Sequence, residues 1–262
     1  MGLPLGGVDM PDNMRVWSAV PKTDTKHTKN ANVDGNSQTT VSGLYMVKLA
    51  TEVFGPVGEG WGYDVSDERY DNTKPVFVKG KEGLEVLRDG DSIVWEQNHT
   101  IRLTLWHGNK ENTVTQFGHT KFRYMKADGS KMIIDNEAPK KSMTDALKKC
   151  LSLLGICADV YMGMFDDVNY KAAAETENAL KNADNADKEY EEQLDKFRAE
   201  VDDGVKAISQ CPNIEAMNRV YGLKANMVDR RAPVLGLDAE QEKLVLVSAY
   251  HSKQKELQES KQ

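Results

Sequence analysis

Two adjacent lysines, Lys148 and Lys149, offer the clearest chemistry in the sequence. They follow Lys141 and the Thr144-Asp145 pair in a segment whose apolar residues recur every three or four positions. On an amphipathic helix this spacing gathers the lysines on the polar face, where ammonium groups can neutralise the phosphates of a nucleic acid. A solvated helix face explains the same pattern, so the spacing alone leaves both interpretations open.

Basic and aromatic residues also mix in the strands that precede this segment. The basic positions are Arg102, Lys121 and Arg123, and the aromatic ones are Trp106, Phe122 and Tyr124. Cations beside flat aromatic rings are typical of proteins that bind single-stranded DNA. The mixture is suggestive only, because half of the side chains on such strands face the core.

Acidic residues and histidines provide an alternative, a metal-dependent nuclease. Carboxylates that could converge on Mg²⁺ are Asp64, Asp67, Glu68, Asp166 and Asp167. Ordinary acids at surface turns and helix ends explain them more simply. His107 and His119 have no third ligand at a recognisable spacing, so we expect them to be sheet-surface histidines and expect no metal site.

Composition and missing motifs narrow the class of protein. The 262 residues are 39% hydrophobic and 29% charged, which predicts a soluble globular protein without a membrane span. No signal peptide is recognisable, so we expect a cytoplasmic protein. The sequence has no phosphate-binding loop, nucleophile elbow, HExxH or GxGxxG motif, which disfavours the enzyme classes that carry them. The cysteines, Cys150, Cys157 and Cys211, are expected to be buried thiols.

Charge is distributed unevenly along the chain. The formal net charge is -7, yet residues 101–150 carry ten Lys and Arg against five Asp and Glu. Residues 171–203 carry five Lys and Arg against eleven Asp and Glu. A basic module is therefore followed by an acidic segment, and the net charge does not argue against a nucleic-acid partner.

Hydrophobic periodicity predicts a helix, an antiparallel meander and a second helix. A spacing of three and four residues indicates a helix over residues 40–54, and alternation with likely turns indicates strands between Trp61 and Ile134. The second helix is expected from about Glu137 to Leu154. Gly118, inside a strand, predicts a bulge or a close backbone approach.

These patterns divide the chain into four parts. We expect an extended N-terminal arm over residues 1–36 and an α+β domain over residues 37–170. An acidic linker or solvated helix follows over residues 171–203, and a small helical unit over residues 204–262. The core of the last unit is thin, which suggests that it packs against a partner.

Four stretches resemble the single-strand annealing proteins related to Rad52, including phage relatives such as the Sak proteins. KKSMTDALKKCLSLLG, residues 140–155, is similar to the family's strongest signature. Weaker likenesses follow in the family's order: ATEVFGPVGEGWGYDV, TIRLTL with TQFGH, and ADVYMGMFDD. Residues 15–29 with Gly35 and Thr39 resemble the phage branch in particular. The resemblance covers about residues 15–170 and implies a curved antiparallel β-meander packed with helices.

The resemblance also implies site residues. Lys148 and Lys149 match the basic pair that faces DNA phosphates, and Arg102 matches a basic strand position. Lys26 or Lys29 occupies the region of another basic contact. Gly118 matches a hairpin glycine at which DNA or a neighbouring protomer would approach the backbone. Ser152 stands where some relatives have arginine, so binding would be weaker or would depend on Lys140, Lys141 or Lys121.

The function implied is binding of single-stranded DNA and annealing of complementary strands without ATP, by a ring or filament of protomers. No catalysis and no cofactor are expected, and a role for Mg²⁺ in annealing is left open. The C-terminal unit would dock a partner exonuclease or the host single-strand binding protein, with a stabilising appendage as the alternative. A metal-dependent nuclease using Asp166 and Asp167, or a duplex-binding protein, remains the alternative function.

Overall fold

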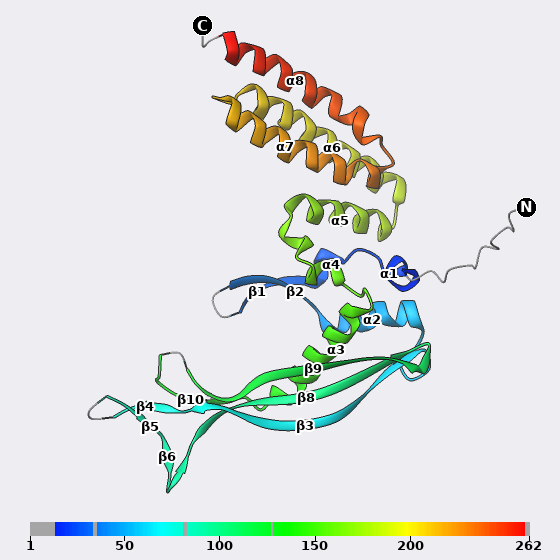
Figure 1. Ribbon diagram of the computed structural model, residues 1–262. Coiled ribbons are helices and arrows are strands. Elements are labelled where there is room, and N and C mark those ends of the chain that lie inside the picture. The colour runs from blue at the N-terminus through cyan, green and yellow to red at the C-terminus, as the bar shows by residue number, and fades with distance from the viewer. Residues whose placement is uncertain (1–13, 34–35, 81–82, 127, 260–262) are drawn as a thin grey trace, which may run out of the picture. The chain divides into compact units, whose positions relative to one another are not determined.

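The structure is a computed structural model that describes residues 14–33, 36–80, 83–126 and 128–259 (Figure 1). The chain forms two compact units. The first contains the described residues up to Pro21 together with Val41–Ala158. The second contains the described residues of Lys22–Thr40 together with Asp159–Gln262.

A curved antiparallel sheet forms the framework of the first unit, with its strands in the order β10-β9-β8-β3 (Figure 1). Arg102 pairs with Asp67 on one side and with Phe117 on the other. Short strand pairs extend the connection from β3 to β8. The strands are β3 (Trp61–Pro75), β4 (Phe77–Lys79), β5 (Leu84–Val86), β6 (Arg88–Asp89), β7 (Ser92–Ile93), β8 (Trp95–His107), β9 (Asn109–Met125) and β10 (Met132–Ile134).

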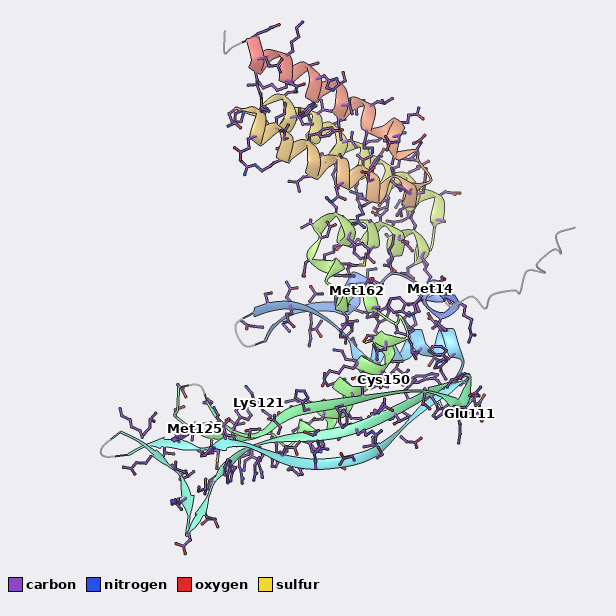
Figure 2. All side chains as sticks on the ribbon, viewed as in Figure 1. Met14, Glu111, Lys121, Met125, Cys150 and Met162 are labelled. Atoms are coloured by element: carbon purple, nitrogen blue, oxygen red, sulfur yellow. The ribbon has the colours of Figure 1, made fainter. Side chains whose placement is uncertain are left out.

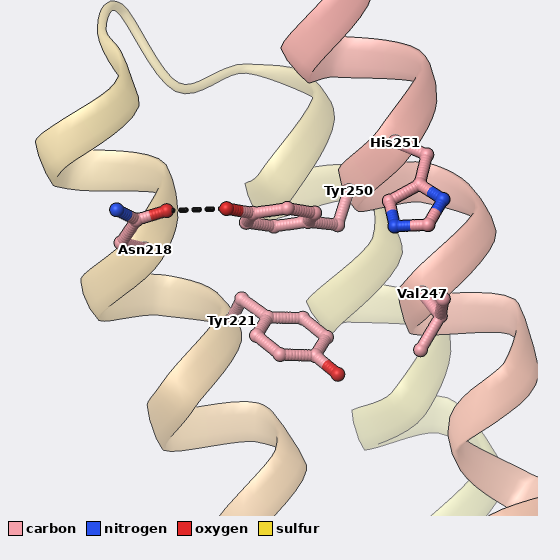
Figure 3. Close-up of a pocket in the computed structure, with 5 residues that line it drawn as sticks. All are labelled: Asn218, Tyr221, Val247, Tyr250 and His251. Carbon is pink, nitrogen blue, oxygen red and sulfur yellow. Dashed lines mark hydrogen bonds between the residues drawn. The ribbon is translucent and has the colours of Figure 1, made fainter.

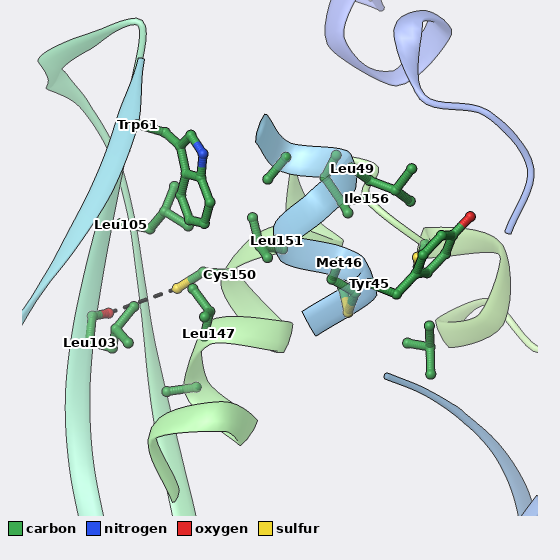
Figure 4. Packing of buried hydrophobic residues seen from close by; sticks show 14 of the residues in the cluster. Tyr45, Met46, Leu49, Trp61, Leu103, Leu105, Leu147, Cys150, Leu151 and Ile156 are labelled. Carbon is green, nitrogen blue, oxygen red and sulfur yellow. Dashed lines mark hydrogen bonds between the residues drawn. The ribbon is translucent and has the colours of Figure 1, made fainter. Parts of the chain in front are cut away.

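Helices α2 (Gly43–Phe54) and α3 (Ala138–Leu153) pack on one face of this sheet, and α1 (Arg15–Ala19) belongs to the same unit. Alternation along β8 turns Ile101, Leu103 and Leu105 towards the helices, and all three are buried. They join a hydrophobic core with side chains from α2 and α3, shown in Figure 4. Cys150 lies within this core, and burial raises the pKa of its thiol to about 11.

The predicted fold class is confirmed. The chain is α+β, with a curved antiparallel meander, packed helices and further helices at its C-terminal end. The helices expected over residues 40–54 and 137–154 are α2 and α3. All three cysteines are free thiols and buried, as expected. No helix of the described part of the chain is long and apolar enough to cross a membrane.

Helices build most of the second unit. Helices α6, α7 and α8 enclose a core that includes Phe197, Met217 and Leu246. The elements of this part of the chain are η1 (Thr25–His27), β1 (Thr28–Val33), β2 (Asn36–Val41), α4 (Ala158–Tyr161), η2 (Met164–Asp166), α5 (Val168–Lys181), α6 (Ala186–Ser209), α7 (Ile214–Arg231), η3 (Pro233–Leu235) and α8 (Ala239–Glu259).

Two segments differ from the expectation. Within residues 1–36, the described part contains helix α1 and strand β1 of a β1-β2 sheet in place of an extended arm. Residues 171–203, expected as an acidic linker or solvated helix, lie largely in α5 and α6. Phe197 and Val201 of α6 are buried, because one face of this charged helix carries apolar residues. The segment is therefore part of the helical packing.

Asp159 ties the two sequence segments of the second unit together. Its carboxylate accepts hydrogen bonds from the backbone N–H of Thr23 at 2.9 Å and from the Thr23 hydroxyl at 2.5 Å. The hydroxyl of Tyr170 donates a third hydrogen bond, also at 2.9 Å. Thr23 and Tyr170 are buried, so the donors depend on this one carboxylate.

Asp159→Ala is expected to lower the free energy of unfolding of the second unit by about 3 kcal/mol, because it leaves buried donors without an acceptor. Tyr170→Phe removes a single donor and is expected to cost about 1 kcal/mol. Urea unfolding followed by helical circular dichroism measures both. Asp184→Ala, at an exposed position, is the matched control. Equal losses in Asp159→Ala and Asp184→Ala would contradict the role of this carboxylate.

Candidate nucleic-acid interface

Helix α3 presents the predicted lysines because its other face is buried. Ala146, Leu147, Cys150 and Leu151 form the buried stripe, which fixes the rotation of the helix on the sheet. Its polar face turns away from the core and carries Lys140, Lys141, Thr144, Asp145, Lys148 and Lys149. The amphipathic pattern therefore predicted the exposed face of α3 correctly.

Gly118 allows α3 to approach the sheet closely. A Cβ atom at this glycine would lie 1.9 Å from the Ser142 carbonyl oxygen and 2.7 Å from the Ala146 backbone nitrogen. The predicted close approach therefore occurs, but the protein's own helix makes it. Gly118 is buried in this contact, which corrects the expectation that DNA or a neighbouring protomer approaches its backbone.

Lys149 is held by two partners. Its Nζ lies 2.7 Å from Asp145 Oδ2 and donates a 3.2 Å hydrogen bond to the Phe117 carbonyl oxygen. The same Asp145 oxygen accepts the His119 backbone N–H at 3.3 Å. The Asp145-Lys149 pair thereby satisfies backbone groups of β9 on the side away from β8. Lys149 has a structural role besides the one predicted.

Lys148 lines a recess of about 360 Å³ on the polar face of α3. The other residues that line it are Glu137, Lys140, Lys141, Thr144 and Asp145. The structure thus brings Lys148 together with Lys140 and Lys141, two of the three lysines that were expected to compensate for Ser152, whereas Lys121 does not line the recess. The Ser152 hydroxyl itself donates a 2.9 Å hydrogen bond to the Lys149 carbonyl oxygen, so it remains on the helix backbone.

Carboxylates accompany the lysines of this recess. Lys141 Nζ lies 2.5 Å from Asp135 Oδ2, and Lys140 Nζ lies 3.2 Å from Glu137 Oε2. The hydrogen bond from Lys141 lowers the pKa of Asp135 and raises that of Lys141. These acids reduce the positive charge of the surface. The sequence argument missed their role, although the three- and four-residue spacings of Glu137-Lys140 and Asp145-Lys149 signal ion pairs.

Arg102 lies on the sheet face opposite α3. It alternates with Ile101 and Leu103, which face the core, and the Arg102 side chain is exposed. Lys121 of β9, marked in Figure 2, lies on this same face because it alternates with Gly118. Arg123 Nε donates a 2.9 Å hydrogen bond to the Trp95 carbonyl oxygen within the sheet. The three strand cations therefore do not join Lys148 and Lys149.

Lys26 and Lys29 belong to the second unit. Lys26 lies in η1 and Lys29 in β1, and both are exposed. Lys148 and Lys149 belong to the first unit. The predicted contacts with DNA are therefore distributed over two separately packed parts of the chain.

Most of the acidic residues considered as alternative metal ligands interact with other groups of the protein. Asp67 pairs with Arg69, and Glu68 Oε1 lies 3.0 Å from His99 Nε2. Asp167 accepts hydrogen bonds from the first turn of α5.

The two candidate histidines are separated along the sheet. His107 pairs with Trp61 and Asn109 at one end, where burial lowers its pKa, whereas His119 pairs with Thr100. Within the described ranges, no group of three or more His, Cys, Asp or Glu is placed to hold a metal ion.

Comparison with known proteins places this geometry in a family. A family model described as the Rad52/22 family double-strand break repair protein matches residues 20–178. The match includes the sheet, helix α3 and the recess that contains Lys148. It ends within α5, so α6, α7 and α8 lie beyond it. A search of curated proteins found no match for the chain.

Proposed function

Because the chain belongs to the Rad52/22 family of double-strand break repair proteins, we propose that it anneals complementary DNA strands without ATP or another cofactor. Membership in this family supports a general role in DNA repair, recombination and strand annealing. We further propose that the protein acts in the cytoplasm, in a phage-type recombination pathway, as a ring or helical oligomer. The observation that carries the proposal is the lysine face of α3 within the matched region.

The mechanism requires binding and alignment without bond chemistry. Lys148, Lys140 and Lys141 line one recess, and ammonium groups there would neutralise phosphates of a single strand. Repetition of the site in an oligomer would order a longer stretch of DNA. The high local concentration of ordered bases then favours pairing with a second strand. Lys26 and Lys29 are proposed to add phosphate contacts from the second unit.

The remaining parts of the proposal concern partners. The helical C-terminal part is proposed to dock a partner exonuclease or a host single-strand binding protein. Mg²⁺ is proposed only as a modulator of annealing, and the protein as non-enzymatic. Support for these points comes from the resemblance to annealing proteins.

Annealing of two complementary labelled oligonucleotides tests the function directly. The full chain is mixed with both strands in the presence of EDTA and without ATP, over a series of salt concentrations. The expected result is annealing faster than the spontaneous reaction, weakened as salt rises because phosphate binding releases counterions. Strand cleavage on addition of Mg²⁺, or preferential binding of duplex without annealing, would contradict the proposal.

Asp135→Asn is expected to strengthen binding of single-stranded DNA, because it releases Lys141 from its 2.5 Å ion pair. An exposed pair of this kind is worth up to about 1 kcal/mol, so the gain in affinity is about two- to fivefold. The slope of log affinity against log salt should steepen by about 0.7 for one additional phosphate contact. Fluorescence anisotropy over a salt series measures both quantities.

Asp128→Asn is the matched control for Asp135→Asn. It removes the same charge, but the Asp128 carboxylate accepts hydrogen bonds from Ser130. A general electrostatic effect would strengthen binding equally in both variants. An effect confined to Asp135→Asn would identify Lys141 as a phosphate contact.

A further inference from the structure

Helix α8, which lies beyond the family match, carries exposed apolar side chains. Leu246 of α8 is fully buried in the core with α6 and α7. Leu244 and Val245 are 62% and 51% exposed although both are apolar. Apolar side chains exposed together on a helix face indicate an interaction surface.

One stripe of α8 combines this apolar surface with charges of opposite sign. Its residues recur every three or four positions and therefore share one face of the helix; they are Glu240, Leu244, Val247, His251 and Lys255. The side chains of Glu240 and Lys255 at its two ends are 84% and 79% exposed. The stripe is acidic near the N-terminus of the helix, apolar at its centre and basic near the C-terminus.

A pocket of about 420 Å³ opens beside the centre of the stripe, between α7 and α8 (Figure 3). Rings of Tyr221 and Tyr250 form its wall, with their centroids 4.9 Å apart. The Tyr250 hydroxyl donates a 2.6 Å hydrogen bond to Asn218 Oδ1, as Figure 3 shows. Val247 and His251 of the stripe complete the lining. An aromatic pocket therefore lies next to an exposed leucine of the same helix.

We propose that the α8 helices of two copies of this chain pack antiparallel through the stripe. The stripe is self-complementary about a two-fold axis between Val247 and Ser248. Glu240 of each copy then faces Lys255 of the other, and Leu244 faces His251, so that Leu244 enters the pocket of the other copy. Parallel packing would instead place Glu240 beside Glu240 and Lys255 beside Lys255, which costs energy through like-charge repulsion.

The charges favour a second copy over an unrelated protein. Within one copy, Glu240 lies 2.6 Å from Lys243 and Lys255 lies 3.9 Å from Glu259, so the contact between copies adds a second partner to each. Two single helices bury less than the roughly 1,200 Å² of a stable interface. The contact is therefore weak by itself and strengthens when copies are already held together in an assembly.

Zero-length cross-linking of the full chain with a carbodiimide tests the contact. This reagent joins a carboxylate to an amine only when they touch. Glu240 and Lys255 are fifteen positions apart on one straight helix, about 22 Å at 1.5 Å per residue, so a bond between them must join two copies. Mass spectrometry of mixed light and heavy isotope-labelled protein is expected to show this bond between unlike copies. The Glu240-Lys243 bond within α8 serves as the internal positive control.

Variants connect the cross-link to the stripe. Leu244→Glu is expected to abolish the Glu240-Lys255 cross-link, because it places a charge against the apolar pocket. Leu223→Glu is the matched control, since Leu223 on α7 is 64% exposed and does not line the pocket. Reversal of both charges, Glu240→Lys with Lys255→Glu, should preserve the cross-link, whereas Glu240→Lys alone should lose it.

Two results would overturn the proposal. One is absence of the Glu240-Lys255 cross-link while the internal Glu240-Lys243 bond forms. The other is a cross-link that Leu244→Glu leaves intact. The test uses no DNA, so its outcome is independent of strand annealing and separates failure of this contact from failure of the proposed function.

Discussion

Simultaneous replacement of Lys148 and Lys149 by alanine is expected to reduce the annealing rate at least tenfold. The two variants remove charge-assisted contacts with phosphates, and a loss of about 1.4 kcal/mol of binding free energy corresponds to a factor of ten. The slope of log affinity against log salt should fall by about 1.4, at 0.7 per phosphate on a single strand. Anisotropy and annealing measured over the same salt series provide both numbers.

Single variants separate the two lysines. Lys148→Ala should weaken binding, because Lys148 lines the recess. Lys149→Ala should also expose backbone groups of β9, because Lys149 donates to the Phe117 carbonyl oxygen. Hydrogen exchange at β9 should therefore increase in Lys149→Ala.

Lysines on α6 supply the matched control for the double variant. Lys188 and Lys206 are exposed and paired with Glu192 and Asp203 on their own helix. Lys188→Ala with Lys206→Ala changes the net charge equally and should leave annealing unchanged. An unchanged salt slope in both Lys148→Ala and Lys149→Ala would refute the site on α3.

Gly118→Ala is expected to destabilise the first unit by about 3 kcal/mol, at the upper end of the usual cost of overpacking. The added Cβ would lie 1.9 Å from the Ser142 carbonyl oxygen, which belongs to helix backbone and cannot rotate away. Relief requires that α3 lift from β9 and lose core contacts. Urea unfolding followed by tryptophan fluorescence measures the loss, since Trp61 lies in this core.

Gly222→Ala provides the comparison for Gly118→Ala. A Cβ at Gly222 of α7 would meet no atom within 4 Å, so a small gain from helix propensity is expected. If Gly118→Ala left the stability of the first unit unchanged, the close packing of α3 on β9 would be contradicted.

The elements around the lysines could be predicted from the sequence because their apolar residues repeat strictly. Ile101, Leu103 and Leu105 alternate and become the buried face of β8, and the three- and four-residue spacing of α3 fixes its buried stripe. Because that stripe is buried, the other face of α3, which carries Lys148 and Lys149, could be predicted to be polar. The expected fold class was confirmed for the same reason.

Other features depend on contacts that periodicity does not encode. Alternation along β8 places the Arg102 side chain on the face of the sheet opposite Ile101 and Leu103. Only the position of α3 shows that Lys148 lies on the other side of the sheet. The many charged residues of α6 led to the expectation of a linker or solvated helix, although the four-residue spacing of Phe197 and Val201 indicates a buried face. The bond from Thr23 to Asp159 joins residues too far apart in sequence for any local pattern.

That last contact also has a consequence for biosynthesis. The described residues of 22–40 belong to the same compact unit as those of 159–259, although more than a hundred residues separate the two segments in sequence. During translation at 5–20 residues per second, the segment around Thr23 emerges roughly 10 s before Asp159 is made. The first unit can begin to fold in that interval, while this early segment waits for its partner. A ribosome that pauses before Asp159 would therefore hold a nascent chain whose second unit has not begun to close.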